Sequence, residues 1–182
     1  MSGDQYKFST EDSKFGLLVE CDLIDKLLVL CLESAEIETG GILVGYYNQP
    51  HDNAIVTDVS SAPDDSKRQR AMFHRGVRGL QPWLDRLWMR QRRYYLGEWH
   101  FHPFASPTAS DTDISQLRRY SEKDSLRCPE PVLLIIGGDP QSVWTVKAYV
   151  APRHRQVMEM HPVNDAVPTK TERMREPWTD LG

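Results

Sequence analysis

The chain has 182 residues, of which 40% are hydrophobic and 26% charged, and these values are typical of a single globular domain. Its net charge of −4 argues against a general nucleic-acid binder, because such proteins need a surplus of lysine and arginine to displace phosphate counterions. No apolar run approaches the roughly 18 residues that a membrane-spanning helix needs, and the N-terminus lacks a signal-peptide pattern. The three cysteines make a poor disulfide framework and a poor thiolate zinc site, so we expect a cytoplasmic protein.

The first part of the chain predicts strands around one helix. We treat residues 1–14 as an N-terminal segment and expect a short strand over 15–22. Residues 22–38 carry apolar side chains at helical spacing and around nearly the whole circumference, which predicts a largely buried helix. Strands are expected over 40–48 and 53–62, and the turn chemistry of the residues between them indicates a hairpin.

The middle of the chain predicts a loop, two helices and a strand. Residues 63–70 are polar and are expected to form a loop. An amphipathic pattern over 77–91 predicts a helix, although Pro82 restricts where it begins or how straight it runs. A strand over 94–102 and a helix over 110–124 are expected to follow.

The last part of the chain predicts the centre of a sheet. The continuous apolar run over 131–138 is typical of a central strand, and residues 142–151 predict a strand with one packed face. A weaker strand over 155–163 precedes the polar segment 164–182, which we expect to be a tail. Strands and helices are mixed without a linker between two cores, so we expect one α/β domain over 15–163.

A pair of histidines and a nearby aspartate form a candidate metal site. Side chains alternate along a strand, so His100 and His102 point to the same face, roughly 6.5–7 Å apart, and two imidazoles can converge on one ion from there. Asp113 falls in the first turn of the next helix. Two imidazoles and one carboxylate leave a fourth position for water, as in catalytic zinc sites. An alternative stays open, because Ser110-x-x-Asp113 is also close to a capping box, which needs no metal.

The full spacing resembles one metalloprotease family. His100-x-His102, seven residues, Ser110, two residues and Asp113 are similar to the JAMM (MPN+) motif, and the upstream glutamate of that motif is matched by Glu38 in "ETGGILVG". The resemblance covers about residues 15–150. It implies a single MPN/JAB-type domain with a central, mixed, mostly antiparallel sheet flanked by helices.

The resemblance also implies roles for the five residues. One Zn²⁺ with a catalytic water is expected on His100, His102 and Asp113, and the ion would lower the pKa of that water toward about 7. Glu38 would act as general base and then as general acid toward the leaving amine. The Ser110 hydroxyl would donate a hydrogen bond to the oxyanion.

One position departs from the family pattern. The residue between the two histidines is usually Ser or Thr in this family, and here it is Phe101. Because Phe101 faces away from the metal side of its strand, we expect a packing change without loss of catalysis. Together with Trp99, it is expected to fix the strand to the core.

The family cleaves isopeptide or peptide bonds after the C-terminal glycines of ubiquitin and its relatives. This chain lacks the long helical extensions of eukaryotic assembly subunits, and it most resembles short bacterial JAMM proteins found beside E1/E2-like proteins, in particular those of CBASS anti-phage operons. The resemblance implies removal of a covalently attached partner from the C-terminus of a cGAS-like nucleotidyltransferase. The substrate would therefore be a ubiquitin-like protein or the C-terminal tail of a conjugated protein.

Two alternatives stay open at this point. The first is a sulfur-carrier peptidase, with the same chemistry on a small ubiquitin-like carrier. The second is a non-catalytic MPN docking module, or a RadC-like JAMM domain associated with DNA. The basic residues that would support a nucleic-acid partner are interpreted as a solvated surface; they are Lys67–Arg70, Arg86, Arg90, Arg92 and Arg93.

Overall fold

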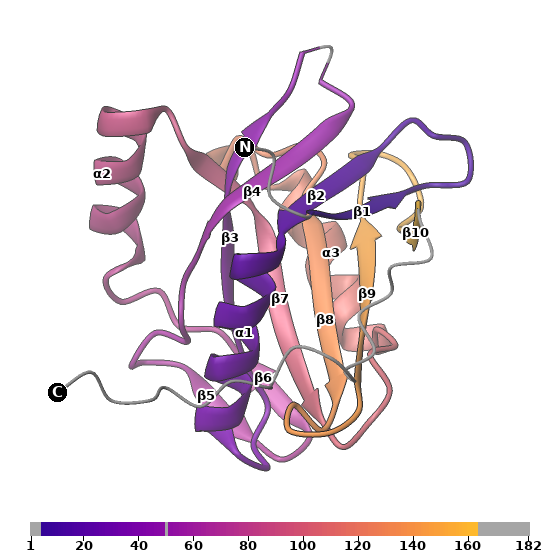
Figure 1. Ribbon diagram of the computed structural model, residues 1–182. Coiled ribbons are helices and arrows are strands. Elements are labelled where there is room, and N and C mark those ends of the chain that lie inside the picture. The colour runs from indigo at the N-terminus through magenta and orange to yellow at the C-terminus, as the bar shows by residue number, and fades with distance from the viewer. Residues whose placement is uncertain (1–4, 50, 164–182) are drawn as a thin grey trace, which may run out of the picture.

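Eight strands close into a barrel in the computed structural model, which describes residues 5–49 and 51–163 (Figure 1). The strand order around the barrel is β1-β10-β9-β8-β7-β3-β4-β2. The strands are β1 (Gln5–Ser9), β2 (Gly16–Glu20), β3 (Thr39–Tyr47), β4 (Asn53–Val59), β7 (Tyr94–Pro103), β8 (Val132–Gly138), β9 (Trp144–Val150) and β10 (Met158–Pro162). All seven of the expected strands are thereby confirmed in place, to within a few residues at their ends, and the hairpin of β3 and β4 is antiparallel as predicted.

The sheet is mixed and mostly antiparallel, as expected, with parallel pairing only between β2 and β4 and between β7 and β8 among the described strands. Its closure corrects the expectation of a central sheet flanked by helices. The strand that closes the barrel is β1, which pairs with both β2 and β10, and no strand was expected in that part of the chain. A five-residue strand with mostly half-buried side chains gives little local signal, and its partners come from opposite ends of the sequence. The expected tail, 164–182, lies outside the described residues.

The first helix, α1 (Cys21–Ser34), is shorter and less buried than predicted. It ends at Ser34, four residues before Glu38, because the next residue, Ala35, has a φ of 55° that is incompatible with a continuing helix. One face of α1 packs into the main core through Ile24, Leu27 and Cys31, while the opposite face leaves Val29 52% exposed. The apolar run was thus wrongly interpreted as a helix buried all round.

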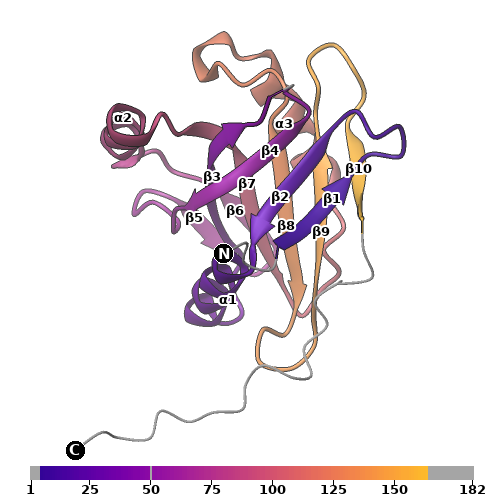
Figure 2. The same cartoon turned by 45° about the horizontal axis from the view of Figure 1, so that its top comes forward.

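The other two helices lie on the outer face of the barrel. Helix α2 (Leu80–Gln91) packs on β3 and β7 through half-buried side chains, and Pro82 is its third residue, where the backbone N–H has no partner within the helix in any case. Helix α3 (Asp111–Glu122), followed by the short η1 (Asp124–Leu126), covers β8 and β9. Figures 1 and 2 show α1 on one side of β7 and β8 and α3 on the other.

The expected loop over 63–70 contains a strand. β5 (Lys67–Gln69) pairs with β6 (Met72–His74) in a separate two-stranded hairpin. The residues of β5 are all exposed, so no hydrophobic alternation was available to reveal it, and its backbone pairing with β6 defines it as a strand. The hairpin lies next to the start of β3, where Glu38 N–H donates to the Gln69 carbonyl over 2.9 Å.

A bulge in β7 decides which side chains face outward. Leu43 pairs with Gly97 but Val44 pairs with Tyr95, so β7 carries one extra residue at this point. After the bulge, Trp99 and Phe101 point into the main core, at 0% and 1% exposure, and fix the strand as expected. The side chains of Glu98, His100 and His102 therefore lie on the opposite, outward face of β7.

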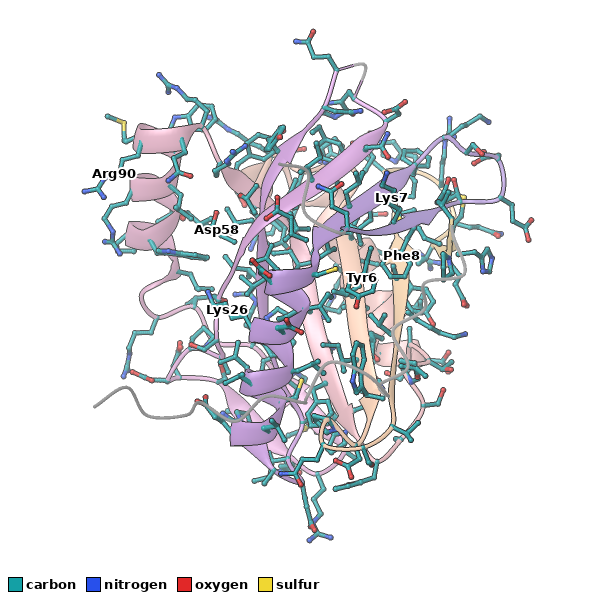
Figure 3. All side chains as sticks on the ribbon, in the orientation of Figure 1. Tyr6, Lys7, Phe8, Lys26, Asp58 and Arg90 are labelled. Carbon is teal, nitrogen blue, oxygen red and sulfur yellow. The ribbon has the colours of Figure 1, made fainter. Side chains whose placement is uncertain are left out.

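The described residues include no helix that is both long and apolar enough to cross a membrane. Of the basic residues interpreted as a solvated surface, Lys67–Arg70, Arg86, Arg90 and Arg92 are exposed, and Arg93, which follows α2, is half-buried. Arg90 is exposed at the outer side of the helix (Figure 3), whereas Arg92 and Arg93 stack over Trp88 and Tyr46, with 5.0 Å and 4.1 Å between guanidinium carbon and ring centroid.

Candidate metal centre

The end of β7 and the first turn of α3 bring three ligand-type side chains together. His100, His102 and Asp113 each offer one ligand atom, and these atoms all lie within 4.8 Å of one another. His100 Nδ1 is 3.0 Å from Asp113 Oδ1, and His102 Nε2 is 3.9 Å from Asp113 Oδ2. His100 is buried, whereas His102 and Asp113 are half-buried, so the group sits at the margin between core and solvent.

Asp113 is held in place by the capping box at the start of α3. The Ser110 hydroxyl accepts from Asp113 N–H at 3.2 Å, while Asp113 Oδ2 accepts from Ser110 N–H at 2.8 Å and from the Ser110 hydroxyl at 2.7 Å. The capping alternative raised by the sequence is therefore present in the structure. It does not compete with ligation, because Oδ1 is left to face His100.

The second nitrogen of each imidazole faces an acceptor away from Asp113. His102 Nδ1 lies 3.2 Å from the Ser106 carbonyl oxygen, which accepts only from a protonated nitrogen, so Nε2 of the neutral ring keeps its lone pair. His100 Nε2 faces Glu98 Oε2 at 3.7 Å. Each histidine therefore directs one ring nitrogen toward Asp113, and its other ring nitrogen toward the Ser106 carbonyl (His102) or the Glu98 carboxylate (His100).

The donor set fits a divalent transition ion. Two imidazoles and one carboxylate are the ligand types that zinc takes in three-ligand sites, where the fourth position stays available to water or substrate. A hard cation such as Mg²⁺ or Ca²⁺ prefers an all-oxygen shell, which two imidazoles do not supply. The residues that would hold a zinc ion are thus His100, His102 and Asp113.

Glu38 lies beside this group, immediately before β3. Its neighbour Gly40 pairs directly with His100 across β3 and β7, and the charges of both His100 and Asp113 act on the Glu38 carboxyl. Partial burial raises the pKa of Glu38 to about 7; the charge of Asp113 adds to this shift and that of His100 opposes it. Such a carboxyl can both accept and return a proton near neutral pH.

Gly40 allows the close packing around His100. A Cβ atom at this position would lie 2.3 Å from the Trp99 carbonyl oxygen, 2.6 Å from the ring of Phe73 and 3.0 Å from His100 Cδ2. Phe73, from the β5–β6 hairpin, contacts the His100 ring edge-to-face with 5.3 Å between centroids. Glycine at this position of β3 therefore allows Phe73, Trp99 and His100 to pack closely against the strand.

Burial, hydrogen bonds and charged neighbours shift the pKa values of His100, His102 and Asp113 in different directions. Burial lowers the pKa of His100, but hydrogen bonding to Asp113 and the nearby Glu98 outweigh it and raise this pKa to about 9. Burial raises the pKa of Asp113, but His100 and Ser110 hold it far below its usual value. The pKa of His102 is lowered, mainly by burial.

The buried polar residues behind His100 were not predicted from the sequence. Glu98 is 1% exposed, and its Oε1 accepts from Arg75 Nε at 2.8 Å. Gln116 Nε2 contacts the other carboxylate oxygen at 3.4 Å and the Tyr120 hydroxyl at 2.9 Å. The signal for Glu98 was available, because it shares the strand face of His100 and His102 by the same two-residue alternation.

Comparison with known proteins identifies a family and several relatives of this chain. Residues 21–150 match the family of prokaryotic homologues of the JAB domain. A CD-NTase/cGAS isopeptidase from Enterobacter hormaechei subsp. hoffmannii is 37% identical over 153 residues, which are 84% of each chain. The probable metalloprotease y4qB from Sinorhizobium fredii is 29% identical over 126 residues, 68% of this chain and 76% of the relative.

A solved structure supports the fold. The solution structure of protein DSY2949 from Desulfitobacterium hafniense superposes with a TM-score of 0.56 at 20% identity, covering 76% of this chain and 86% of the other. At that identity the likeness concerns the fold alone. The family match and the 37% identical relative carry the assignment: the chain belongs to the prokaryotic JAB family of JAMM-type proteins and is an enzyme of the peptidase and isopeptidase class.

Proposed function

We propose that this protein is a zinc-dependent isopeptidase that cleaves after the C-terminal glycine region of a ubiquitin-like protein, or of a protein conjugated by E1/E2-like enzymes. The observation that carries the proposal is the convergence of the two imidazoles of His100 and His102 and the Asp113 carboxylate within 4.8 Å, beside the raised-pKa carboxyl of Glu38. We propose zinc as the ion, held by these three residues. When bound, zinc would activate water and polarise the scissile carbonyl.

Glu38 is the proposed proton carrier of the reaction. With a pKa of about 7, its carboxylate takes the proton of the attacking water and its carboxylic acid returns that proton to the leaving amine. A carboxyl at its ordinary pKa would accept the proton poorly and donate it only in acid. Partial burial beside Asp113 therefore suits Glu38 to both halves of the cycle.

Ser110 is the proposed hydrogen-bond donor to the oxyanion. Its hydroxyl donates to Asp113 Oδ2 in this structure, and that oxygen also accepts from the Ser110 backbone N–H at 2.8 Å. The hydroxyl proton can turn toward the substrate while the backbone N–H keeps Asp113 in place. Such a donor is worth roughly 2–4 kcal/mol in the transition state.

The substrate assignment rests on the relatives. Three bacterial relatives, from Enterobacter hormaechei, Vibrio cholerae and Escherichia coli, carry the name CD-NTase/cGAS isopeptidase, at 37%, 32% and 30% identity. We therefore propose that this enzyme deconjugates a cGAS-like nucleotidyltransferase in CBASS anti-phage defence. We propose a glycine tail as the substrate segment, since glycine brings no side chain next to the ligand residues.

The metal content of the purified protein tests the proposal first. Wild type is expected to hold near one zinc per chain by elemental analysis and to lose it in His102→Ala, whereas His161→Ala, an exposed histidine of β10, should retain it. The zinc-loaded protein should then cleave a fusion of a ubiquitin-like tail to a reporter, and Glu38→Ala should not. Absence of zinc uptake in wild type would overturn the proposal. Equal cleavage with Ala or Leu in place of the last glycine would overturn the glycine-tail assignment.

A further inference from the structure

Glu98 is a buried carboxylate that the proposed reaction does not use. It lies directly behind His100 on the outward face of β7 and is 1% exposed. A cavity of about 10 Å³, bordered by Glu98, His100 and Leu133 among others, lies beside it against α3 and is no larger than one water molecule. Bulk solvent therefore does not solvate this charge, and protein groups must do so.

The partners of Glu98 divide between its two oxygens. Oε1 accepts from Arg75 Nε at 2.8 Å, and Arg75 in turn donates through Nη1 to the Gly76 carbonyl at 2.8 Å. Oε2 has Gln116 Nε2 at 3.4 Å and His100 Nε2 at 3.7 Å. Arg75 thus orients the carboxylate, and the second oxygen is presented to Gln116 and to the imidazole.

The ion pair with Arg75 does not by itself explain why a carboxylate is buried at position 98. A buried pair such as Arg75 and Glu98 commonly stabilises a protein no better than apolar side chains of the same volume, because both charges lose their hydration. His100 Nε2 gives the carboxylate a second purpose. That nitrogen is buried and has no hydrogen-bond partner among the described residues, and Glu98 Oε2 is the acceptor that it faces.

The two histidines share one arrangement. His102 directs Nε2 toward Asp113 and Nδ1 toward the Ser106 carbonyl, and His100 directs Nδ1 toward Asp113 and Nε2 toward Glu98. We infer that Glu98 is a positioning residue for His100: its Oε2 accepts a hydrogen bond from Nε2–H, fixes the ring orientation, and so selects Nδ1 as the nitrogen that binds the metal. A carboxylate in this place also makes the ligating nitrogen more basic.

The inference rests on the proposed function, because it concerns a ligand of the proposed zinc ion. The test is zinc affinity, measured by competition with a chromophoric chelator, together with the ¹H–¹⁵N spectrum of the His100 ring. Glu98→Gln keeps an acceptor but removes its charge. Glu98→Leu combined with Arg75→Met removes the acceptor without leaving Arg75 as an unpaired buried cation. Tyr120→Phe is the control, because its hydroxyl contacts Gln116 in the same network.

Zinc affinity is expected to fall about 10- to 100-fold in the double variant and by a smaller factor in Glu98→Gln, whereas Tyr120→Phe should stay within about threefold of wild type. Zinc-loaded wild type should show His100 protonated at Nε2 and ligated through Nδ1. In Glu98→Gln the Nε2 proton should move upfield, because the hydrogen bond loses its charge.

The failures of the two proposals are distinguishable. A wild-type protein that takes up no zinc would overturn the proposed function and this inference with it. A wild type that binds zinc, with Glu98→Gln equal in affinity and with an unchanged His100 spectrum, would overturn the role of Glu98 alone. Ligation of His100 through Nε2 would do the same. Should the double variant not fold, as judged by circular dichroism, Glu98→Gln decides the question.

Discussion

The carboxylate of Asp113 lies with Oδ1 3.0 Å from His100 Nδ1 and with Oδ2 2.7 Å from the Ser110 hydroxyl. One side chain thereby completes the N-terminal cap of α3 and faces the histidines of β7. Asp113 thus connects the start of α3, which the capping box fixes locally, to the side chains of β7. The capping box, which stabilises the start of a helix with or without a metal, therefore also places Asp113 in the candidate metal centre.

Asp113→Asn should separate the two roles of this residue. The amide oxygen can still accept from Ser110 N–H, so we expect the loss of unfolding free energy to stay near 1 kcal/mol, while the zinc stoichiometry falls well below one. Asp111→Asn removes a charge from the same first turn without touching the site and should keep its zinc. Thermal unfolding measures the stability of both variants, and elemental analysis measures their zinc content. Zinc retained in Asp113→Asn at wild-type affinity would exclude Asp113 as a ligand.

The raised pKa of Glu38 predicts a pH dependence of stability in the metal-free protein. The folded state favours the neutral carboxyl, so its contribution to stability is fully present below the ordinary pKa of 4.5 and is lost as the pH rises through about 7. Glu38→Gln removes this loss and should be more stable than wild type at pH 8, by about 1 kcal/mol after allowing for solvent screening. Urea unfolding at pH 4.5 and pH 8 measures the difference.

The control for this prediction is Glu33→Gln, which replaces an exposed glutamate of α1. Its stability relative to wild type should change little between the two pH values. In the zinc-loaded enzyme, Glu38→Gln should also lower kcat by about 10²- to 10⁴-fold with zinc content unchanged. Wild-type turnover in Glu38→Gln would show that another group carries the proton.

Ser110 is expected to act in capping and in catalysis, and two substitutions distinguish these roles. Ser110→Gly keeps most of the capping stability, with a loss of a few tenths of a kcal/mol, but has no hydroxyl to offer the oxyanion. We expect its kcat to fall about 10²- to 10³-fold. Ser110→Thr retains a hydroxyl and should keep most of the activity. Steady-state kinetics on a fusion of a ubiquitin-like tail checks both, and an unchanged kcat in Ser110→Gly would restrict Ser110 to capping.

Gly40→Ala should disturb the candidate centre from the strand next to it. The added methyl group would meet the Trp99 carbonyl, the Phe73 ring and His100 at 2.3, 2.6 and 3.0 Å, so β3 and β7 must separate or His100 must shift. We expect a loss of about 1–3 kcal/mol of stability and a weaker zinc affinity. Gly79→Ala, strained by a φ of 78° but with nothing within 4 Å, should lose about 1 kcal/mol and leave zinc binding unchanged.

Phe101→Ser restores the residue type usual in the family and should nevertheless harm this protein. Phe101 is 1% exposed in the main core, so the substitution leaves a cavity and is expected to cost at least about 3 kcal/mol. The zinc affinity of the folded variant should stay close to that of wild type, because the side chain points away from His100. Phe104→Ser, at a position 66% exposed, should change stability by less than about 0.5 kcal/mol.

The sequence by itself determined the local parts of this protein. Two-residue alternation placed His100 and His102 on one face of β7, the capping pattern placed Ser110 and Asp113 at the start of α3, and continuous hydrophobicity identified β8. The same alternation applied to Glu98 would have identified the carboxylate behind His100. These features follow from neighbours in the chain, whose spacing a sequence displays directly.

Only the tertiary structure decided what depends on distant partners. Closure of the barrel by β1 requires strands from both ends of the chain, and the β5–β6 hairpin is held by backbone pairing between exposed residues. The proximity of Glu38 to the histidines follows from the pairing of Gly40 with His100, and its raised pKa follows from the burial that this pairing creates. Burial and electrostatic shifts are properties of the assembled surroundings, so residue types and spacing alone do not specify them.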